Sequence, residues 1–334
     1  MYPRVEILAE RFFRPFHPTN SFFGGTEELL VNLASFLASK NLEVIVYVHD
    51  TCTKPVTYQN ALYVDFPNYE SSAMKPFRNI VICINTLPSV FETKAKYFYF
   101  TNLFNTNLLK LPVNNLEKVI TISNYQKKLL IDTLPQSLQD IAVPKIITIP
   151  HGINTEDYTS AKIAHKEKIC LYTSSHDRGL VDLLKIWYSV NKETGYKLIV
   201  TYGNSSYTSI DVTGVEYMTN VDDKGMIDLY KKARFWIHPA KGPELFCISA
   251  QKAIAANTIP IYSPNYALPE TIGECGLALK NFDSPKDLID VLNDYNNIFK
   301  SFSRFRSSKH IFTHKEINEM YFNLITTSLK LKHT

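Results

Sequence analysis

The sequence predicts an α/β protein of two domains, each built around a parallel β-sheet. The chain has 334 residues, a length that fits two core-forming domains of roughly 150 residues each. Hydrophobic residues make up 45% of the chain and charged residues 20%, which excludes disordered, collagen-like and coiled-coil proteins. Short apolar segments typical of buried strands alternate with segments of helical periodicity along almost the whole chain, as in sheets whose parallel strands are connected by helices.

Residues 1–152 are the predicted N-terminal domain. Its first predicted helix has Leu29, Leu33 and Leu37 on one face, as expected for a helix that covers a sheet. The predicted helices span 26–40 and 124–134, and the predicted strands span 5–9, 43–48, 79–85, 97–101, 118–123 and 145–150. The polar stretch at 151–166 interrupts the alternation and is predicted to be a linker.

Residues 153–315 are the predicted C-terminal domain, in which the alternation resumes. The predicted strands span 168–173, 197–202, 235–239, 258–262 and 276–279, and the predicted helices span 180–193, 226–233, 245–256 and 286–298. A last apolar-periodic stretch at 316–331 predicts a terminal helix. Two similar halves favour two Rossmann-like domains with a cleft between them, and that cleft is the expected binding site.

The charge and the cysteine content restrict the partners and the compartment. The net charge of +4 is well below that of a dedicated duplex-binding protein, although it suits a phosphorylated ligand. The five cysteines are scattered and include no Cys-x-x-Cys pair, so neither a disulfide framework nor a structural zinc site is expected. The residues before the first predicted strand are not expected to be a signal peptide, and no apolar run approaches the ~18 residues of a membrane span. We expect a cytoplasmic protein, in the host cytoplasm if the chain is viral, with peripheral membrane association left open.

Two glycines between the first predicted strand and the first long helix form the first candidate site. Gly24 and Gly25 would let backbone N–H groups approach an anion at the helix N-terminus. A tight turn capped by Thr26 or Glu27 is an equally good interpretation. The patterns Gly-x-Gly-x-x-Gly and Walker A are absent from the sequence, so a dinucleotide fingerprint and a P-loop are not supported.

The second candidate site follows the strand at 168–173. Ser174, Ser175 and Arg178 lie between the end of this strand and the start of the next helix, where an arginine and two hydroxyls could hold a pyrophosphate. The alternative is a surface turn in which Arg178 pairs with Asp177 or with solvent.

The third candidate site follows the strand at 235–239. Glu244 stands where a helix begins, so its carboxylate could accept hydrogen bonds from sugar hydroxyls. The amides of residues 245–248 would then point toward a phosphate. The alternative role of Glu244 is to stabilise the N-terminus of that helix.

Six segments in order resemble glycosyltransferase family 4, whose members are retaining nucleotide-sugar transferases of the GT-B fold. The segments are 23–27, 118–125, 149–154, 178–180, 244–248 and 268–272. The resemblance covers residues 3–328, and residues 312–314 with the terminal helix resemble the family's ending, in which the last helix crosses back to the N-terminal domain. The resemblance therefore implies that residues 316–332 belong to the N-terminal domain, and that the two domains face each other across a cleft.

The resemblance also implies roles for individual residues, with the donor held by the C-terminal domain and the acceptor by the N-terminal one. Arg178 would neutralise the donor pyrophosphate and Glu244 would contact the donor sugar, which makes them the expected catalytic residues. The expected donor-binding residues are Gly24, Gly25, Ser174, Ser175, Arg178, Thr219, Val221, Glu244, Leu245, Phe246, Cys247, Ile248 and Lys252. Arg14, Thr101 and Asn102 are expected on the acceptor side.

Three positions depart from the family pattern. The family's second glutamate, eight positions after the first, falls on Lys252, which cannot accept hydrogen bonds from ribose hydroxyls but could meet a phosphate. The first basic residue of the usual phosphate-binding pair falls on Thr173, and a histidine often found in the N-terminal domain falls on Thr101. Altered donor specificity and lost activity are both compatible with these departures.

No metal or other cofactor is expected. The Asp-x-Asp motif of GT-A enzymes is missing, since Asp222 and Asp223 are adjacent and suit an acidic surface turn. The expected donor is a nucleoside diphosphate sugar, with a UDP-sugar favoured. The acceptor is left open among glycans, lipids, small metabolites and hydroxymethylated DNA bases of a virus or phage, and so is the oligomeric state. The alternative function is a catalytically inactive module that binds a nucleotide-sugar or a glycan.

Overall fold

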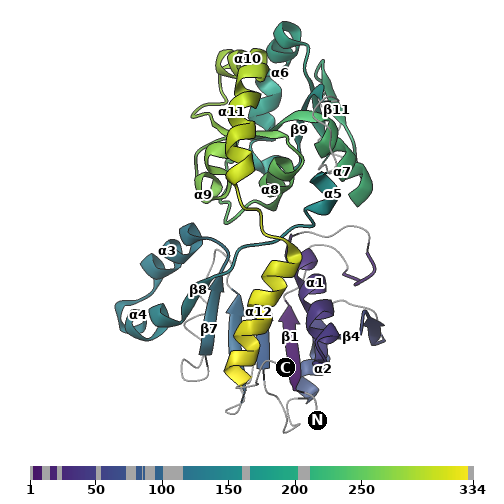
Figure 1. The fold of residues 1–334 in the computed structure, drawn as a ribbon, viewed down its shortest axis with the longest axis vertical. Helices are drawn as coiled ribbons and strands as arrows, with labels where there is room; N and C mark the ends of the chain where they lie inside the picture. Colours follow the sequence, from purple (N-terminus) through teal and green to yellow (C-terminus); the bar gives the residue numbers. More distant parts are fainter. Residues whose placement is uncertain are drawn as a thin grey trace. The chain divides into compact units, whose positions relative to one another are not determined.

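The protein divides into two compact units, residues 1–151 with 314–334 and residues 152–313. Each unit holds one β-sheet with helices packed beside it (Figure 1). The structure is a computed structural model that describes residues 3–9, 16–20, 25–49, 54–72, 80–84, 86, 95–100, 116–159, 166–201 and 211–329.

The first unit contains an eight-stranded sheet in the order β3-β4-β2-β1-β5-β6-β7-β8. The strands are β1 (Arg4–Ala9), β2 (Glu43–Val48), β3 (Val56–Tyr58), β4 (Ala61–Asp65), β5 (Ile80–Ile84), β6 (Lys96–Phe100), β7 (Leu116–Thr121) and β8 (Ile146–Thr148). Only β3 runs antiparallel to its neighbour, β4, among the described strands. The apolar strand β5 is buried along its whole length, as its continuous run of Ile, Val and Cys requires.

The helices of the first unit include the last helix of the chain. They are α1 (Gly25–Ser39), α2 (Pro67–Ser72), α3 (Asn124–Thr133), α4 (Gln136–Ala142) and α12 (His314–Leu329). Figure 1 shows α12 beside α1, and Lys40 Nζ forms a 2.9 Å ion pair with Glu319 Oε1. The N-terminus of α3 is capped by Ser123, whose hydroxyl accepts a 3.0 Å hydrogen bond from the amide of Gln126.

The second unit contains a six-stranded sheet in the order β11-β10-β9-β12-β13-β14, and its paired strands are all parallel among the described residues. The strands are β9 (Glu167–Tyr172), β10 (Lys197–Val200), β11 (Val215–Tyr217), β12 (Ala233–His238), β13 (Ile259–Tyr262) and β14 (Leu277–Ala278). In sequence order this is the 3-2-1-4-5-6 arrangement of a dinucleotide-binding sheet. The direction of winding therefore reverses between the neighbouring strands β9 and β12.

The helices of the second unit place apolar side chains in the hydrophobic core around this sheet. They are α5 (Glu156–Thr159), α6 (Leu180–Thr194), α7 (Asp223–Lys232), α8 (Ile248–Ala255), α9 (Leu268–Ile272), α10 (Pro285–Asn293) and α11 (Tyr295–Ser308). The long helix α6 buries Leu180, Leu183 and Trp187. It ends at Gly195, whose φ of 71° is a left-handed conformation that suits glycine.

The predicted α/β architecture is confirmed, with a largely parallel sheet in each unit and the last helix packed in the first one. One predicted helix is wrong, because residues 286–298 fall into α10 and the start of α11, which are separated at Asp294. The strands β3, β4 and β11 were not predicted, and α5 lies within the stretch predicted as a linker. The hairpin between β3 and β4 turns at Gln59 and Asn60, with φ values of 46° and 65°, so it lacks the Asn-Gly pair that usually marks such a turn.

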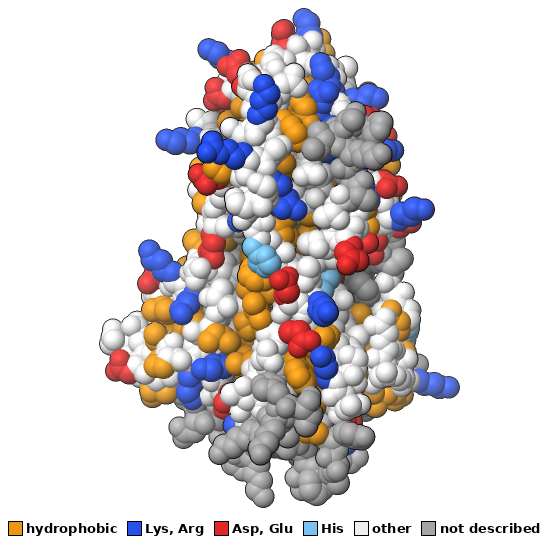
Figure 2. All heavy atoms as spheres, viewed as in Figure 1, with side chains coloured by type: hydrophobic (Ala, Val, Ile, Leu, Met, Phe, Trp, Pro, Cys, Tyr) orange, Lys and Arg blue, Asp and Glu red, His pale blue; other side chains and the backbone are white. Residues whose placement is uncertain are grey.

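The charged side chains on the surface and the state of the described cysteines can be compared with the expectations from composition. Figure 2 shows basic and acidic side chains spread over the viewed face rather than gathered in one patch. Cys83, Cys170, Cys247 and Cys275 are buried free thiols. Among the helices of the described residues, none is long and apolar enough to cross a bilayer.

His151, at the end of the first unit, predicts a pH dependence of stability. Burial lowers the pKa of His151 from 6.5 to about 4; nearby Glu28 opposes this shift and His314 adds to it. As the pH falls from 6.5 toward 4, the unfolded chain binds a proton that the folded chain excludes. The free energy of unfolding should therefore fall over this range, by up to ~1.4 kcal/mol per pH unit.

Urea unfolding at a series of pH values between 7.5 and 4.5 measures this slope. We expect His151→Gln to flatten it, whereas His310→Gln, which changes an exposed histidine, should leave it as in the wild type. Equal slopes in the wild type and in His151→Gln would contradict the prediction.

Candidate functional site

The candidate site lies at the carboxyl ends of β9 and β12, where the strand order reverses. The loops that follow two strands at such a point leave on opposite sides of the sheet, and ligands of open α/β sheets bind there. Ser174 and Arg178 follow β9, and Glu244 follows β12. Because β9 and β12 are neighbours, two of the three candidate segments of the sequence meet at one place.

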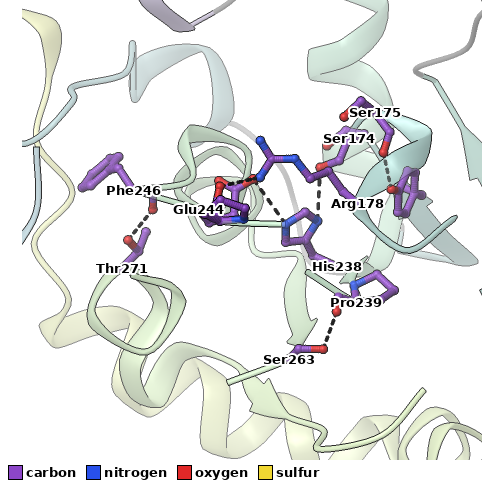
Figure 3. Close-up of polar contacts among 12 residues, drawn as sticks. Ser174, Ser175, Arg178, His238, Pro239, Glu244, Phe246, Ser263 and Thr271 are labelled. Carbon is purple, nitrogen blue, oxygen red and sulfur yellow. Dashed lines mark hydrogen bonds and ion pairs between the residues drawn. The ribbon is translucent and has the colours of Figure 1, made fainter. Parts of the chain in front are cut away.

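An ion pair connects these two segments. Arg178 Nη1 donates a 2.7 Å hydrogen bond to Glu244 Oε1 and another of 2.7 Å to the carbonyl of Pro243 (Figure 3). The side chains are 28% and 18% exposed. These two bonds use both hydrogens of Nη1, and the other three guanidinium N–H groups donate to no residue that the structure describes. Arg178 therefore keeps donors for a ligand while it is paired with Glu244.

Two glycines allow the two loops to approach each other. Gly179 has a φ of 102°, and a β-carbon on it would lie 2.7 Å from Cβ of Pro239. A β-carbon on Gly242 would lie 3.3 Å from Cδ of Arg178. The loop after β9 and the loop after β12 are thus in van der Waals contact, and this contact determines where the Arg178 side chain lies.

His238 lies beneath the ion pair, at the last position of β12. Its side chain is fully buried, its Nδ1 lies 3.1 Å from Ser174 Oγ, and its Nε2 lies 3.6 Å from Glu244 Oε1 (Figure 3). The imidazole stacks on the ring of Trp236 at 5.1 Å between centroids. Nε2 has no hydrogen-bond partner among the described residues. Sequence reasoning missed this histidine, and the only signal for it was its place at the end of a strand just before Glu244.

Two strained residues flank Glu244. Ala240 has a φ of 43° and Cys247, the residue before α8, has a φ of 73°. Neither is a glycine or an asparagine, so each conformation costs on the order of 1–3 kcal/mol, and such residues concentrate at functional sites. Burial raises the pKa of the Cys247 thiol well above its usual value, and the charge of Glu244 raises it further.

The hydroxyl of Thr173 points into the interior of the unit. Its Oγ1 accepts a 2.9 Å hydrogen bond from the indole N–H of Trp236 and lies 3.2 Å from the hydroxyl of Tyr230. Lys252 lies on α8 and is partly buried. The side chain of Thr173 therefore takes part in hydrogen bonds inside the unit.

The remaining predicted site residues are distributed as follows. Ser175 orients the loop after β9, because its carbonyl accepts a 2.6 Å hydrogen bond from the hydroxyl of Tyr172. The carbonyl of Phe246 accepts a hydrogen bond from the hydroxyl of Thr271.

Thr219 and Val221 follow β11, at the same edge of the sheet but with β10 between them and β9. Leu245 and Ile248 stand on either side of Phe246 and Cys247, and Ile248 begins α8.

The predicted residues of the first domain are mostly outside the described residues. Gly25 begins α1. Gly24, Arg14, Thr101 and Asn102 lie outside the part of the chain that the structure describes.

A separate cavity of about 240 Å³ lies between β14 and α11 and shares no residue with this site. Its lining residues are Ile259, Glu274, Gly276, Leu277, Asp294, Asn297, Ile298, Ser301 and Phe302. With two carboxylates and no basic side chain among them, these residues suit an anionic ligand poorly.

Comparison with solved structures identifies the fold. The chain is similar to a glycosyltransferase from Rickettsia africae, with a TM-score of 0.75 and 15% identity over 99% of this chain and 100% of that one. The chain has the GT-B fold. Similarity to sucrose-phosphate synthase from Thermosynechococcus elongatus gives a TM-score of 0.73 and 13% identity over 98% and 99% of the two chains. HepE from Anabaena, solved in complex with UDP and glucose, gives a TM-score of 0.68 and 12% identity over 98% and 100%.

Comparisons of sequence give no relative for this GT-B chain. No protein-family model matches it, and no curated protein matches it either.

The contact between Gly179 and Pro239 predicts that Gly179→Ala is destabilising, and Gly195→Ala serves as the control for backbone strain alone. Gly179→Ala adds a β-carbon in a left-handed conformation and against Pro239, so we expect it to lower the free energy of unfolding by about 2–4 kcal/mol. Gly195→Ala also has a left-handed φ, of 71°, but its new β-carbon would meet nothing within 4 Å. It should therefore lose only the ~1–2 kcal/mol of backbone strain.

Urea or thermal unfolding of the two variants measures the difference, which reports the contact between the loops. Equal losses in the two variants would show that this contact is absent in solution.

Proposed function

We propose that the protein is a retaining glycosyltransferase of family 4 type, which moves one sugar from a nucleoside diphosphate sugar to an acceptor hydroxyl. The observation that carries the proposal is the Arg178–Glu244 pair at the reversal of strand order in a GT-B fold. A cation for the diphosphate and a carboxylate for the sugar hydroxyls stand there side by side. Both come from segments that resemble the family.

Arg178 would bind the diphosphate. Three of its N–H groups point to no described acceptor, and a guanidinium offers them in a planar arrangement that matches phosphate oxygens. The helix α6 begins two residues later, at Leu180, and its fifteen residues give it a full N-terminal dipole, which also favours an anion. Ser174, Ser175 and Lys252 would supply further polar contacts to the phosphates.

Glu244 would orient the donor sugar, since a carboxylate accepts hydrogen bonds from two hydroxyls. The backbone of residues 245–248 would contact the sugar or the phosphate. Thr219 and Val221, farther along the edge of the sheet, would border the nucleobase. HepE from Anabaena was solved in complex with UDP-glucose, which supports UDP-glucose or a related UDP-sugar as the donor here.

The reaction would proceed on one face of the sugar. The acceptor oxygen forms its bond to the anomeric carbon on the side from which the diphosphate departs, and the acceptor proton passes to the departing phosphate oxygen. The step then needs chiefly positive charge at the leaving group, which Arg178 supplies, and no pair of carboxylates of the glycosidase kind. Transfer by this route requires no metal ion.

The first domain would bind the acceptor. Gly24 and Gly25 would form the turn that approaches the donor phosphates, and Arg14, Thr101 and Asn102 would lie on the acceptor side. The acceptor classes that suit this assignment are a glycan, a lipid, a small metabolite and a modified DNA base.

A second candidate function is an inactive module that binds a nucleotide-sugar or a glycan. The hydrogen bonds of Thr173 to Trp236 and Tyr230 favour it, because they leave the position of the family's first basic residue without a group for the phosphate. Only the transferase releases a nucleoside diphosphate in a manner that depends on the acceptor.

Arg178→Ala tests the proposed phosphate site. A hydrogen bond to a charged group contributes ~1.5–3 kcal/mol, so we expect UDP to bind roughly 10- to 150-fold more weakly. Release of UDP from a UDP-sugar should become undetectable. Isothermal titration and a diphosphate assay measure the two effects.

Lys185→Ala removes one positive charge from the same unit at a residue whose side chain is 68% exposed, and it should bind UDP as the wild type does. Unchanged UDP affinity in Arg178→Ala would remove this residue from the phosphate site.

Lys252→Glu distinguishes the two candidate functions. It replaces a cation beside the proposed diphosphate by an anion, so we expect donor binding to weaken at least about tenfold in an active transferase. Lys252→Gln, which is neutral, should give a smaller effect of the same sign. Tighter donor binding in Lys252→Glu, measured by titration with UDP-glucose, would instead favour the inactive module.

A further inference from the structure

The three side chains of His238, Glu244 and Cys247 form a cluster of ligand atoms of the kinds that bind transition metals. His238 Nε2, a carboxylate oxygen of Glu244 and Cys247 Sγ all lie within 4.8 Å of one another. The His238 side chain is fully buried, and its Nε2 has no hydrogen-bond partner among the described residues. A buried nitrogen without a partner is costly, so its persistence calls for a ligand.

We propose that the His238–Glu244–Cys247 cluster binds one Zn²⁺ ion. Nitrogen, oxygen and sulfur donors together suit zinc better than Mg²⁺ or Ca²⁺, which prefer oxygen ligands only. In a tetrahedral zinc site the nitrogen and oxygen ligands are about 3.4 Å apart. The 3.6 Å between His238 Nε2 and Glu244 Oε1 is already close to this value, and water would complete the four ligands.

Ser174 and Trp236 hold the imidazole in a suitable orientation. When Nδ1 donates to Ser174 Oγ, at 3.1 Å, the lone pair of Nε2 points toward Glu244 and is available to a metal ion. A histidine that binds a metal through one nitrogen usually donates from the other in this way. The stacked ring of Trp236 prevents the imidazole from turning away.

The strained backbone at Cys247 brings the sulfur to the cluster. The left-handed φ of 73° is unfavourable for a cysteine, and it directs the thiol toward His238 and Glu244 instead of along α8. The sulfur already lies within 4.8 Å of the other two ligand atoms, and it would approach them further as the metal ion binds. As the metal–sulfur bond forms, the thiol proton passes to solvent.

The metal ion would compete with Arg178 for the carboxylate of Glu244. A consequence that rests on the proposed function is that zinc inhibits sugar transfer, because Glu244 can no longer contact the donor sugar. The metal site itself does not depend on that function, and its binding is measured with no nucleotide present.

Titration of the reduced full-length protein with Co²⁺ tests the site. Co²⁺ has the same ligand preferences as Zn²⁺ here, and a cobalt–thiolate bond gives an intense charge-transfer absorption in the near ultraviolet. We expect one equivalent of Co²⁺ to produce this band and one equivalent of Zn²⁺ to abolish it.

Variants assign the ligands. Cys247→Ser should remove the band, and Cys247→Gly, which suits the left-handed backbone, should remove it in a protein at least as stable as the wild type. His238→Gln should weaken Co²⁺ binding at least tenfold, and Ser174→Ala, which loses only the orienting contact, should weaken it about 10- to 100-fold. Cys275→Ser changes a free thiol outside the cluster and should leave the band unchanged.

Two results would overturn the proposal. One is the absence of a thiolate band at stoichiometric Co²⁺ in the wild-type protein. The other is a band that survives in both Cys247→Ser and Cys247→Gly, which would place the metal on another cysteine. In either case His238 would be held only by its contacts to Ser174, Trp236 and Glu244.

Discussion

The candidate site depends on one topological constraint, the reversal of strand order between β9 and β12. The chain winds away from β9 in one direction as far as β11 and in the other from β12 to β14, so the loops after these two central strands diverge. The space at the carboxyl ends of these two strands is therefore open to side chains and ligands. The side chains that the two loops place there determine the chemistry of the site.

The loops meet through small residues and through strain. The ring of Pro239 packs against Gly179, and the aliphatic part of the Arg178 side chain packs against Gly242. The left-handed conformations of Ala240 and Cys247 turn the chain sharply on both sides of Glu244. Together these features carry a free-energy cost that the buried core beneath the site offsets. A less strained loop would not place the carboxylate of Glu244 beside both a guanidinium and an imidazole, and this supports a role in binding rather than in stability.

The architecture and two of the candidate segments could be predicted from the sequence because both have short-range signals. Continuous apolar strands such as β5 and one-sided helices such as α6 are visible within ten to fifteen residues, and Arg178 and Glu244 lie at strand-to-helix junctions. His238 could not be predicted as a site residue, since its role comes from Ser174 and Glu244, which are distant in the sequence. The break at Asp294 escaped prediction for a different reason: the apolar periodicity continues through it, and no glycine or proline marks the end of α10.

The two positions of this domain that differ from the pattern of glycosyltransferase family 4, which the sequence resembles, have opposite electrostatic effects. Thr173 stands where a cation is expected in the proposed phosphate site, and its hydroxyl forms hydrogen bonds with Trp236 and Tyr230 instead. Lys252, on α8, places a cation where an anion is expected. The positions 173, 178, 244 and 252 together are therefore more positive than the family pattern, and not less. The ion pair between Arg178 and Glu244 is partly exposed, so opening it for a ligand costs only ~1 kcal/mol. A site with this balance of charge suits the diphosphate of the donor that we propose, and that proposal requires groups other than a second glutamate to contact the ribose.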